Sequence, residues 1–164
     1  MATVLEWKFR IPRLNDGPRI WELIRDAGTL DLNSPYTYLM LSEFFHDTCI
    51  VAESGSQLAG FVAGFRLPTR QTTLFIWQVA VHPNFRRQRL GTIMIQSLLE
   101  RESLRDIEFL EATVTPDNRA SDALFHAIAD QHDAGCHIRP CFSAEVFPGS
   151  AHRPELLYHI GPLR

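Results

Sequence analysis

The stretch LFIWQVAVHPNFRRQRLGTIMIQ, residues Leu74–Gln96, constrains the fold more than any other part of the chain. Its apolar run Leu74–Val81, rich in β-branched and aromatic residues, predicts a buried strand that Pro83 ends. A short basic turn follows, with Arg86, Arg87 and Arg89, and an amphipathic helix then begins at Leu90-Gly91. Because the first N–H groups of a helix lack intrahelical partners, this arrangement favours an anion site. The alternative is an ordinary connection with a solvated arginine cluster.

The remaining patterns predict helices and further strands on both sides of this stretch. Helix starts are expected at Asp16, as a cap with Pro18 in the first turn, and at Ser34 with Pro35 behind it. The expected strands are 6–11, 48–53, 58–67, 74–81, 107–114, 136–142 and 156–160, and the expected helices are 16–28, 34–45, 90–101 and 119–132, the last with Ala120, Leu124 and Ile128 on one face. The order β-α-α-β-β-β-α-β-α-β-β predicts an α/β fold, a mixed sheet with helices on both faces, in a single domain of residues 1–164.

Composition excludes several classes of function. A net charge of −3 argues against a general nucleic-acid binder. We find no signal sequence and no apolar run of the roughly 18 residues that a membrane span needs, so we expect a cytoplasmic protein without a membrane partner. Cys49, Cys136 and Cys141 lack the spacing of a disulfide framework or a zinc ribbon. Cys136-His137 with Cys141 would be the one conceivable metal site, but alternation along a strand explains these residues as well, and we expect no metal.

The segment DLNSPYTY, Asp31–Tyr38, differs in texture from its helical neighbours. It combines a carboxylate, an amide, a proline and two tyrosines, which together can hold a small polar ligand. The alternative is a capping loop in which Asp31 and Asn33 satisfy backbone N–H groups.

The element order and the central stretch resemble the GNAT superfamily of N-acetyltransferases, which carries Q/R-x-x-G-x-G/A where it binds the pyrophosphate of acetyl-CoA. Here the positions are Arg86-Arg87-Gln88-Arg89-Leu90-Gly91. The first and last residues match, whereas Arg89 replaces the middle glycine, so its side chain must point away for the backbone to approach a phosphate. The resemblance implies an acetyl-CoA site made by Val79, Ala80, Val81, Arg86, Arg87, Gln88, Arg89, Leu90, Gly91, Thr92 and Asn118. Phe125 stands where the family often has a tyrosine that protonates the departing thiolate.

Four segments narrow the resemblance to the L-2,4-diaminobutyrate acetyltransferase family of ectoine biosynthesis. They are DLNSPYTYLML (31–41), FIWQVAVHP (75–83), TPDNRASDALF (115–125) and FPGSAHRPELLYHI (147–160). This family transfers an acetyl group from acetyl-CoA to the γ-amine of L-2,4-diaminobutyrate, and its members form dimers. The resemblance therefore implies a small diamine substrate and a homodimer.

The matching residues give each part of this substrate a partner. Asp31 and Glu155 are acids for the two ammonium groups, Trp77 is an apolar wall with cation–π capacity, and the further contacts are Asn33, Tyr36, Tyr38 and His152. We expect Asp31 to anchor the α-amine and Glu155 to accept the γ-amine proton, directly or through water. The competing interpretations are core packing for Trp77, a surface charge for Glu155 and a loop histidine for His152.

Two steps of the chemistry stay open between alternatives. Thiolate protonation falls to water or to Tyr38, and a backbone N–H near Val79–Val81 would meet the oxyanion if the strand bulges there. Two other functions remain: acetylation of another diamine or polyamine, and a domain that binds acyl-CoA without turnover.

Overall fold

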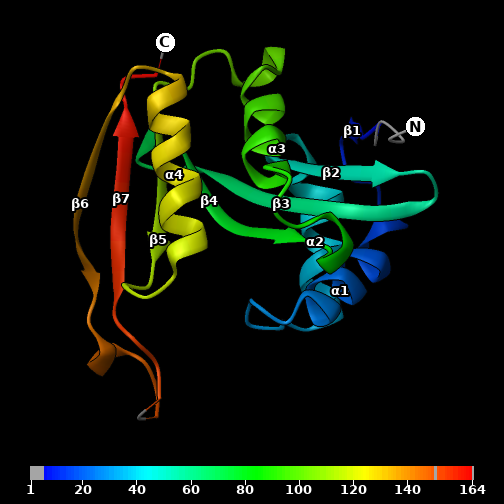
Figure 1. Cartoon of the computed structure of the whole chain (residues 1–164), viewed down its shortest axis with the longest axis horizontal. Coiled ribbons are helices and arrows are strands. Elements are labelled where there is room, and N and C mark those ends of the chain that lie inside the picture. Colours follow the sequence, from blue (N-terminus) through cyan, green and yellow to red (C-terminus); the bar gives the residue numbers. More distant parts are fainter. Residues whose placement is uncertain (1–5, 150, 164) are drawn as a thin grey trace. The chain divides into compact units, whose positions relative to one another are not determined.

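A computed structural model describes residues 6–149 and 151–163 of the chain. Its seven strands form one sheet in the order β1-β2-β3-β4-β5-β7-β6, and the described residues contain four α-helices (Figure 1). The expected order of elements and the mixed sheet are confirmed. The bounds are β1 Lys8–Arg10, α1 Asp16–Ala27, α2 Pro35–Phe44, β2 Cys49–Ser54, β3 Gln57–Leu67, β4 Arg70–Val81, α3 Leu90–Leu99, β5 Phe109–Val114, α4 Arg119–Gln131, β6 Gly135–Phe142 and β7 Glu155–Gly161.

The chain packs as two compact units, and each is described by itself. The first runs to Phe65 and includes Gln78–Arg105, while the second comprises Arg66–Trp77 and the chain from Asp106 onward. Strand β4 contributes to both, because its residues up to Trp77 belong to the second unit and the rest to the first. One domain over residues 1–164 stays a prediction.

In the first unit, helices cover both faces of the antiparallel pair β2–β3. Phe61 and Ala63 of β3 share a hydrophobic core with the apolar residues of α1 and α2. The preceding residue, Gly60, faces α3, where a Cβ atom would lie 2.6 Å from the Cε of Met94. Successive residues of a strand point to opposite faces, so α3 lies opposite α1 and α2. Because Gly60 has no side chain, α3 can pack closely against β3 at this position.

The two predicted helix starts of this unit differ from expectation in detail. Asn15, not Asp16, occupies the cap position of α1, and Asp16 is the first helical residue. Its carboxylate, which is 3% exposed, accepts the Arg13 N–H at 2.7 Å and pairs with Arg10 at 2.6 Å. Ser34 does precede α2, but its hydroxyl makes no capping bond. Asp16 thus serves ion pairing rather than capping.

In the second unit, β5 pairs parallel with β4 and antiparallel with β7, which in turn pairs antiparallel with β6. Helix α4 packs on β6 and β7 (Figure 1). The predicted apolar face of α4 is only partly right, because Ala120 is exposed and the buried residues are Phe125, Ile128 and Ala129. The reason is the position around the helix. Phe125 and Ala129 lie at the middle of the buried face, and Ala120 lies outside this face, toward solvent.

Strand β4 is longer than its apolar run predicts, and its residues differ more in exposure. It begins at Arg70, four residues before Leu74. Arg70 is a polar start that the strand tolerates, because its guanidinium donates to both oxygens of the buried Glu111 carboxylate at 2.6 and 2.9 Å. Farther along, Gln78 is buried, whereas Trp77 remains 39% exposed. The expectation of a buried strand is therefore wrong at Trp77.

Candidate active site

The connection from β4 to α3 is a compact turn with an unusual backbone. After Val81, the His82 N–H donates to the Ala59 carbonyl at 2.8 Å, and the buried Phe85 fastens the turn to the first unit. Arg87 and Arg89 then both adopt φ of 60°, in the left-handed region. For a residue with a Cβ atom this conformation costs about 1–2 kcal/mol. Two such residues within three positions show that the surrounding structure determines the path of the turn.

Arg89 keeps the backbone conformation for which the motif glycine is suited. It occupies the cap position of α3 with φ 60° and ψ 19°, and its side chain is exposed. The replacement therefore changes the side chain at this position without changing the type of backbone conformation that a glycine would adopt. Substitution of the motif glycine thus leaves the turn intact.

The three arginines of the turn do not act alike. Arg86 donates from its guanidinium to the Ala27 carbonyl at 2.6 Å. Ala27 is the last residue of α1, and a cation at a helix C-terminus interacts favourably with the helix dipole. The side chain of Arg86 thus ties the turn to α1. Arg87 and Arg89 are exposed and leave their charges in solvent.

The start of α3 offers a set of backbone donors. Its first intrahelical bond runs from the Ile93 N–H to the Arg89 carbonyl at 3.0 Å. The N–H groups of Leu90, Gly91 and Thr92 consequently have no acceptor within the helix. The first turn of α3 carries no acidic residue that would repel an anion. The turn can therefore receive phosphate oxygens through its backbone.

The loop between α1 and α2 holds its backbone and exposes a carboxylate. The Trp21 indole N–H donates to the Asn33 carbonyl at 3.0 Å, and the Gln78 amide N–H donates to the Asp31 carbonyl at 3.4 Å. Asp31 is exposed, and within the part of the chain that the structure describes its carboxylate has no hydrogen bond or ion pair. The capping interpretation of this loop is therefore not supported. Among the described residues, neither the Asp31 carboxylate nor the Asn33 side-chain oxygen accepts a backbone N–H, and the Asn33 amide donates to the Asp31 carbonyl at 3.5 Å instead.

The two tyrosines of this segment have opposite environments. Tyr36 lies on α2 and is 68% exposed. Tyr38 is completely buried in the core of the first unit, and its hydroxyl donates to the Gln78 Oε1 atom at 3.3 Å. A phenol proton engaged in this way inside a core is poorly placed to reach a departing thiolate.

The second unit carries the other predicted residues. Asn118 caps α4, because its Oδ1 accepts the Ser121 N–H at 3.0 Å. The neighbouring Asp117 pairs with Arg153 at 3.1 Å, which ties the segment before β7 to the start of α4. His152 stacks on Phe147 with ring centroids 3.6 Å apart. Glu155 is the first residue of β7 and is half-buried.

Phe125, at the position of the family's tyrosine, is buried with its ring against Tyr158 of β7, the centroids being 6.1 Å apart. The Tyr158 hydroxyl donates to the Asp122 carboxylate at 2.7 Å. Burial, reinforced by this hydrogen bond, raises the pKa of Tyr158 to about 12. The proton of Tyr158 is thus directed at Asp122 rather than toward a ligand.

Sequence reasoning missed Gln78 and Trp21, whose donors fix the loop. The available signal was the glutamine itself, a polar residue within the apolar run FIWQVAV. It also did not foresee the state of Cys49, which burial makes inert by raising its pKa to about 12. Cys49 is completely buried in the core of the first unit.

Neither a metal centre nor a membrane segment is visible in the described residues. Within them, no three or more His, Cys, Asp or Glu side chains are arranged to hold a metal ion. Cys136 and His137 are consecutive in β6 and so point to opposite faces of the sheet. Among the helices of residues 6–149 and 151–163, none has the length and hydrophobicity needed to cross a bilayer.

Comparison with known proteins agrees with this fold and this turn. The chain belongs to the acetyltransferase (GNAT) family, whose profile matches residues 18–129. Within it, the chain is 46% identical to the L-2,4-diaminobutyric acid acetyltransferase of Shouchella clausii over 153 residues, 93% of this chain and 85% of that protein. It is 45% identical to the enzyme of the same name from Bordetella parapertussis over 162 residues, 98% of this chain and 87% of that protein.

A solved structure extends the likeness to three dimensions. The diaminobutyrate acetyltransferase EctA of Paenibacillus lautus, in complex with its substrate L-2,4-diaminobutyric acid and coenzyme A, superposes with a TM-score of 0.93 at 43% identity. The match covers 96% of each chain. The resemblance inferred from the four sequence segments is thereby confirmed.

Proposed function

We infer that this chain transfers the acetyl group of acetyl-CoA to the γ-amine of L-2,4-diaminobutyrate. The product is N4-acetyl-L-2,4-diaminobutyrate, the precursor that is cyclised to ectoine. The observation that carries this inference is the match over 96% of both chains to an enzyme solved with this substrate and coenzyme A, at 43% identity. Such a match extends beyond the cofactor turn to the segments that carry Asp31, Trp77 and Glu155.

For acetyl-CoA, the backbone of the turn is the main ligand. The donors of Leu90, Gly91 and Thr92 and the absence of acids in the first turn of α3 suit a pyrophosphate. Arg87 and Arg89 are exposed near these donors in sequence and add positive charge. Gln88 completes the turn. We assign Val79–Val81 and Asn118 to the pantetheine arm, for which the Asn118 amide keeps its N–H₂ donors after its oxygen has capped α4.

For diaminobutyrate, the two carboxylates have different roles. Asp31 presents an exposed carboxylate on a held backbone, which suits an anchor for the α-ammonium. Glu155 accepts the proton that the γ-ammonium must lose before attack, directly or through water. The exposure of Trp77 on a central strand supports its role as the wall of the substrate's short chain. Asn33, Tyr36 and His152 are further contacts.

The transfer is direct. The γ-amine lone pair forms the new C–N bond at the thioester carbonyl, and a backbone N–H near Val79–Val81 stabilises the oxyanion. Collapse of this intermediate breaks the C–S bond. The attacking nitrogen gives its second proton to solvent water, which leaves a neutral amide, and the thiolate takes up one proton. We assign that proton to water, since Tyr38 is buried and donates to Gln78. The complete burial of Cys49 supports a mechanism without an acetyl-cysteine at this position.

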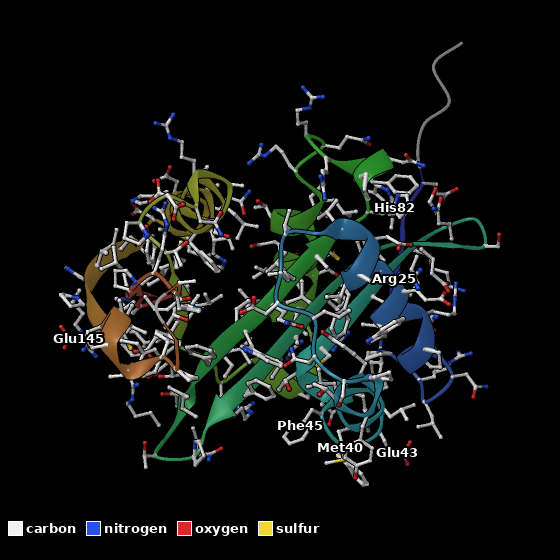
Figure 2. All side chains as sticks on the ribbon, turned by 90° about the horizontal axis from the view of Figure 1, so that it is seen from below. Arg25, Met40, Glu43, Phe45, His82 and Glu145 are labelled. Carbon is white, nitrogen blue, oxygen red and sulfur yellow. The ribbon has the colours of Figure 1, made fainter. Side chains whose placement is uncertain are left out.

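The chain acts as a homodimer in the cytoplasm, where acetyl-CoA is available. Two large apolar side chains of α2, Tyr36 and Phe44, are 68% and 69% exposed and support association. Figure 2 shows Met40 and Phe45 close together beside Glu43. Light scattering after size exclusion should give twice the 18.7 kDa of the chain. A mass of one chain would contradict the dimer.

Product analysis tests the function. The protein is incubated with acetyl-CoA and L-2,4-diaminobutyrate, thiol release is followed, and the product is examined by NMR. We expect acetylation at the γ-nitrogen alone. Acetylation at the α-nitrogen would refute the regiochemistry, and faster turnover of ornithine or a polyamine would point to another amine. Thermal stabilisation by acetyl-CoA without thiol release on any diamine would indicate a non-catalytic acyl-CoA-binding domain.

A further inference from the structure

Gln78 is a buried amide on the central strand whose two ends are both engaged. Its side chain is 5% exposed, its Oε1 accepts from the Tyr38 hydroxyl at 3.3 Å, and its Nε2 donates to the Asp31 carbonyl at 3.4 Å. The orientation of the Gln78 amide follows from chemistry. The Asp31 carbonyl can only accept a hydrogen bond, so it must face the Nε2 atom of Gln78 and not the Oε1 atom. A buried amide that lost these partners would be destabilised by about 1–3 kcal/mol, so the arrangement resists turning.

The loop that Gln78 reaches is held at a second point. Trp21 of α1 donates to the Asn33 carbonyl at 3.0 Å, and the Asn33 amide donates back to the Asp31 carbonyl at 3.5 Å. All of these bonds end on main-chain carbonyls. The Asp31 carboxylate itself takes part in none of them. The backbone at Asp31 is thus held by the buried Gln78 amide and by the Asn33 amide, while its charge is left available.

We propose that Gln78 is a positioning residue for diaminobutyrate, acting through the Asp31 backbone, with Trp21 as the second support at Asn33. This rests on the proposed function, in which Asp31 anchors the α-ammonium. A charge held in place before the substrate arrives binds it without the cost of ordering the loop. Tyr38 completes the chain Tyr38–Gln78–Asp31 by orienting the amide, which gives this buried hydroxyl a role outside proton transfer.

The test compares apolar and conservative variants in steady-state kinetics. Gln78→Met keeps the length of the side chain and removes both polar ends. We expect KM for diaminobutyrate to rise about tenfold, equivalent to about 1.4 kcal/mol, while KM for acetyl-CoA stays within about twofold. Tyr38→Phe leaves the bond to Asp31 in place and should raise KM for diaminobutyrate less than about threefold. Trp21→Phe should act in the same direction as Gln78→Met.

A double-mutant cycle separates positioning from a general structural effect. If Gln78 acts through Asp31, the double variant Asp31→Asn/Gln78→Met should have the same KM for diaminobutyrate as Asp31→Asn alone. Additive effects would overturn the inference and leave the proposed function standing. A lowered melting temperature with both KM values unchanged would likewise overturn it. Should Gln78→Met fail to fold, Gln78→Glu is the substitute, because it keeps the acceptor for Tyr38 and sets an oxygen against the Asp31 carbonyl.

The cycle also distinguishes failure of the proposed function. If Asp31→Asn leaves KM for diaminobutyrate unchanged, Asp31 is not the anchor. In that case the proposed role of Asp31 and the positioning role of Gln78 are both wrong. If Asp31→Asn raises that KM and Gln78→Met does not, only the positioning role falls.

Discussion

The turn before α3 and the loop after α1 present opposite parts of the chain to their proposed ligands. In the turn, Leu90, Gly91 and Thr92 have backbone N–H groups without an acceptor in the helix. Two arginines of this turn are left-handed, and Arg86 bonds to the Ala27 carbonyl. In the loop, the buried Gln78 and the half-buried Trp21 hold the backbone carbonyls of Asp31 and Asn33, and the Asp31 side chain is exposed. In the proposed function, the turn therefore uses its main chain for binding and the loop uses a side chain.

This difference predicts how each region responds to substitution. A backbone site depends on conformation, so it accepts any side chain that leaves φ and ψ unchanged, as Arg89 does in the place of a glycine. A side-chain site depends on a particular charge and loses its function when that charge is removed. Substrate residues should accordingly be far less replaceable than the residues of the cofactor turn.

The largest effect should come from Glu155→Gln. Loss of the proton acceptor should lower kcat about 100-fold or more, because general-base catalysis contributes about 10²- to 10⁴-fold. KM for diaminobutyrate should change little, and both are measured by thiol release. Glu145→Gln, at an exposed acid in the preceding segment (Figure 2), is the matched control and should behave like the parent. A rise in KM without loss of kcat would make Glu155 an anchor instead.

Asp31→Asn should have the next largest effect. A hydrogen bond to a charged group contributes about 1.5–3 kcal/mol, so KM for diaminobutyrate should rise about 30-fold, with a smaller change in kcat. The same substitution at Asp26, an exposed acid that pairs with Arg25 on α1, serves as control and should leave KM unchanged. Equal effects at both positions would show that general electrostatics, not an anchor, attracts the substrate.

The sequence predicts the fold better than it predicts these contacts. The order of elements follows from local periodicity. Single residues also mark two boundaries, because Gly28 ends α1 and Pro35 begins α2. Arg70, by contrast, looks like part of a polar connection, because its partner Glu111 lies 41 residues away. The sequence predicts Ala120 on the apolar face of α4, but Ala120 is exposed. The residues of a single helical turn do not indicate which side of the helix contacts the strands.

The candidate site shows the same division. Motif spacing locates the turn and the unusual position of Arg89 without any structure. The bond from Arg86 to Ala27 spans 59 residues and that from Gln78 to Asp31 spans 47, so neither is visible in a pattern of neighbours. The sequence leaves thiolate protonation open between water and Tyr38, and only the structure shows that Tyr38 is buried in the core.

Glu111 offers a contrast with Asp31, as a carboxylate whose partners are complete. Burial by itself would raise the pKa of Glu111, but hydrogen bonds from Arg70 and His159 bring that pKa below its usual range. A lowered pKa in the folded state stabilises the protein above the unfolded pKa of about 4.3, and this contribution disappears as the pH falls through the folded value.

Glu111→Gln should therefore lower the free energy of unfolding at pH 7 by about 1.5 kcal/mol, less than for a fully buried pair because Arg70 is half-exposed. Urea unfolding at several pH values measures the difference from the parent, which should shrink below about pH 4. Glu108→Gln, at an exposed side chain, is the control. If the difference in free energy of unfolding between Glu111→Gln and the parent stays constant down to pH 3, the loss of stability comes from the changed shape of the side chain and not from its charge.

The smallest effects should come from Arg89, and here the type of substitution matters more than the loss of charge. Arg89→Gly removes the charge but suits φ of 60°, so KM for acetyl-CoA should rise less than about threefold. Arg89→Val also removes the charge, but a β-branched residue is an outlier in the left-handed region, so the turn should distort and KM rise about tenfold. Both KM values are measured at saturating diaminobutyrate. Equal losses in the two variants would mean that the Arg89 guanidinium binds the phosphates, and the turn would then work through a side chain as the loop does.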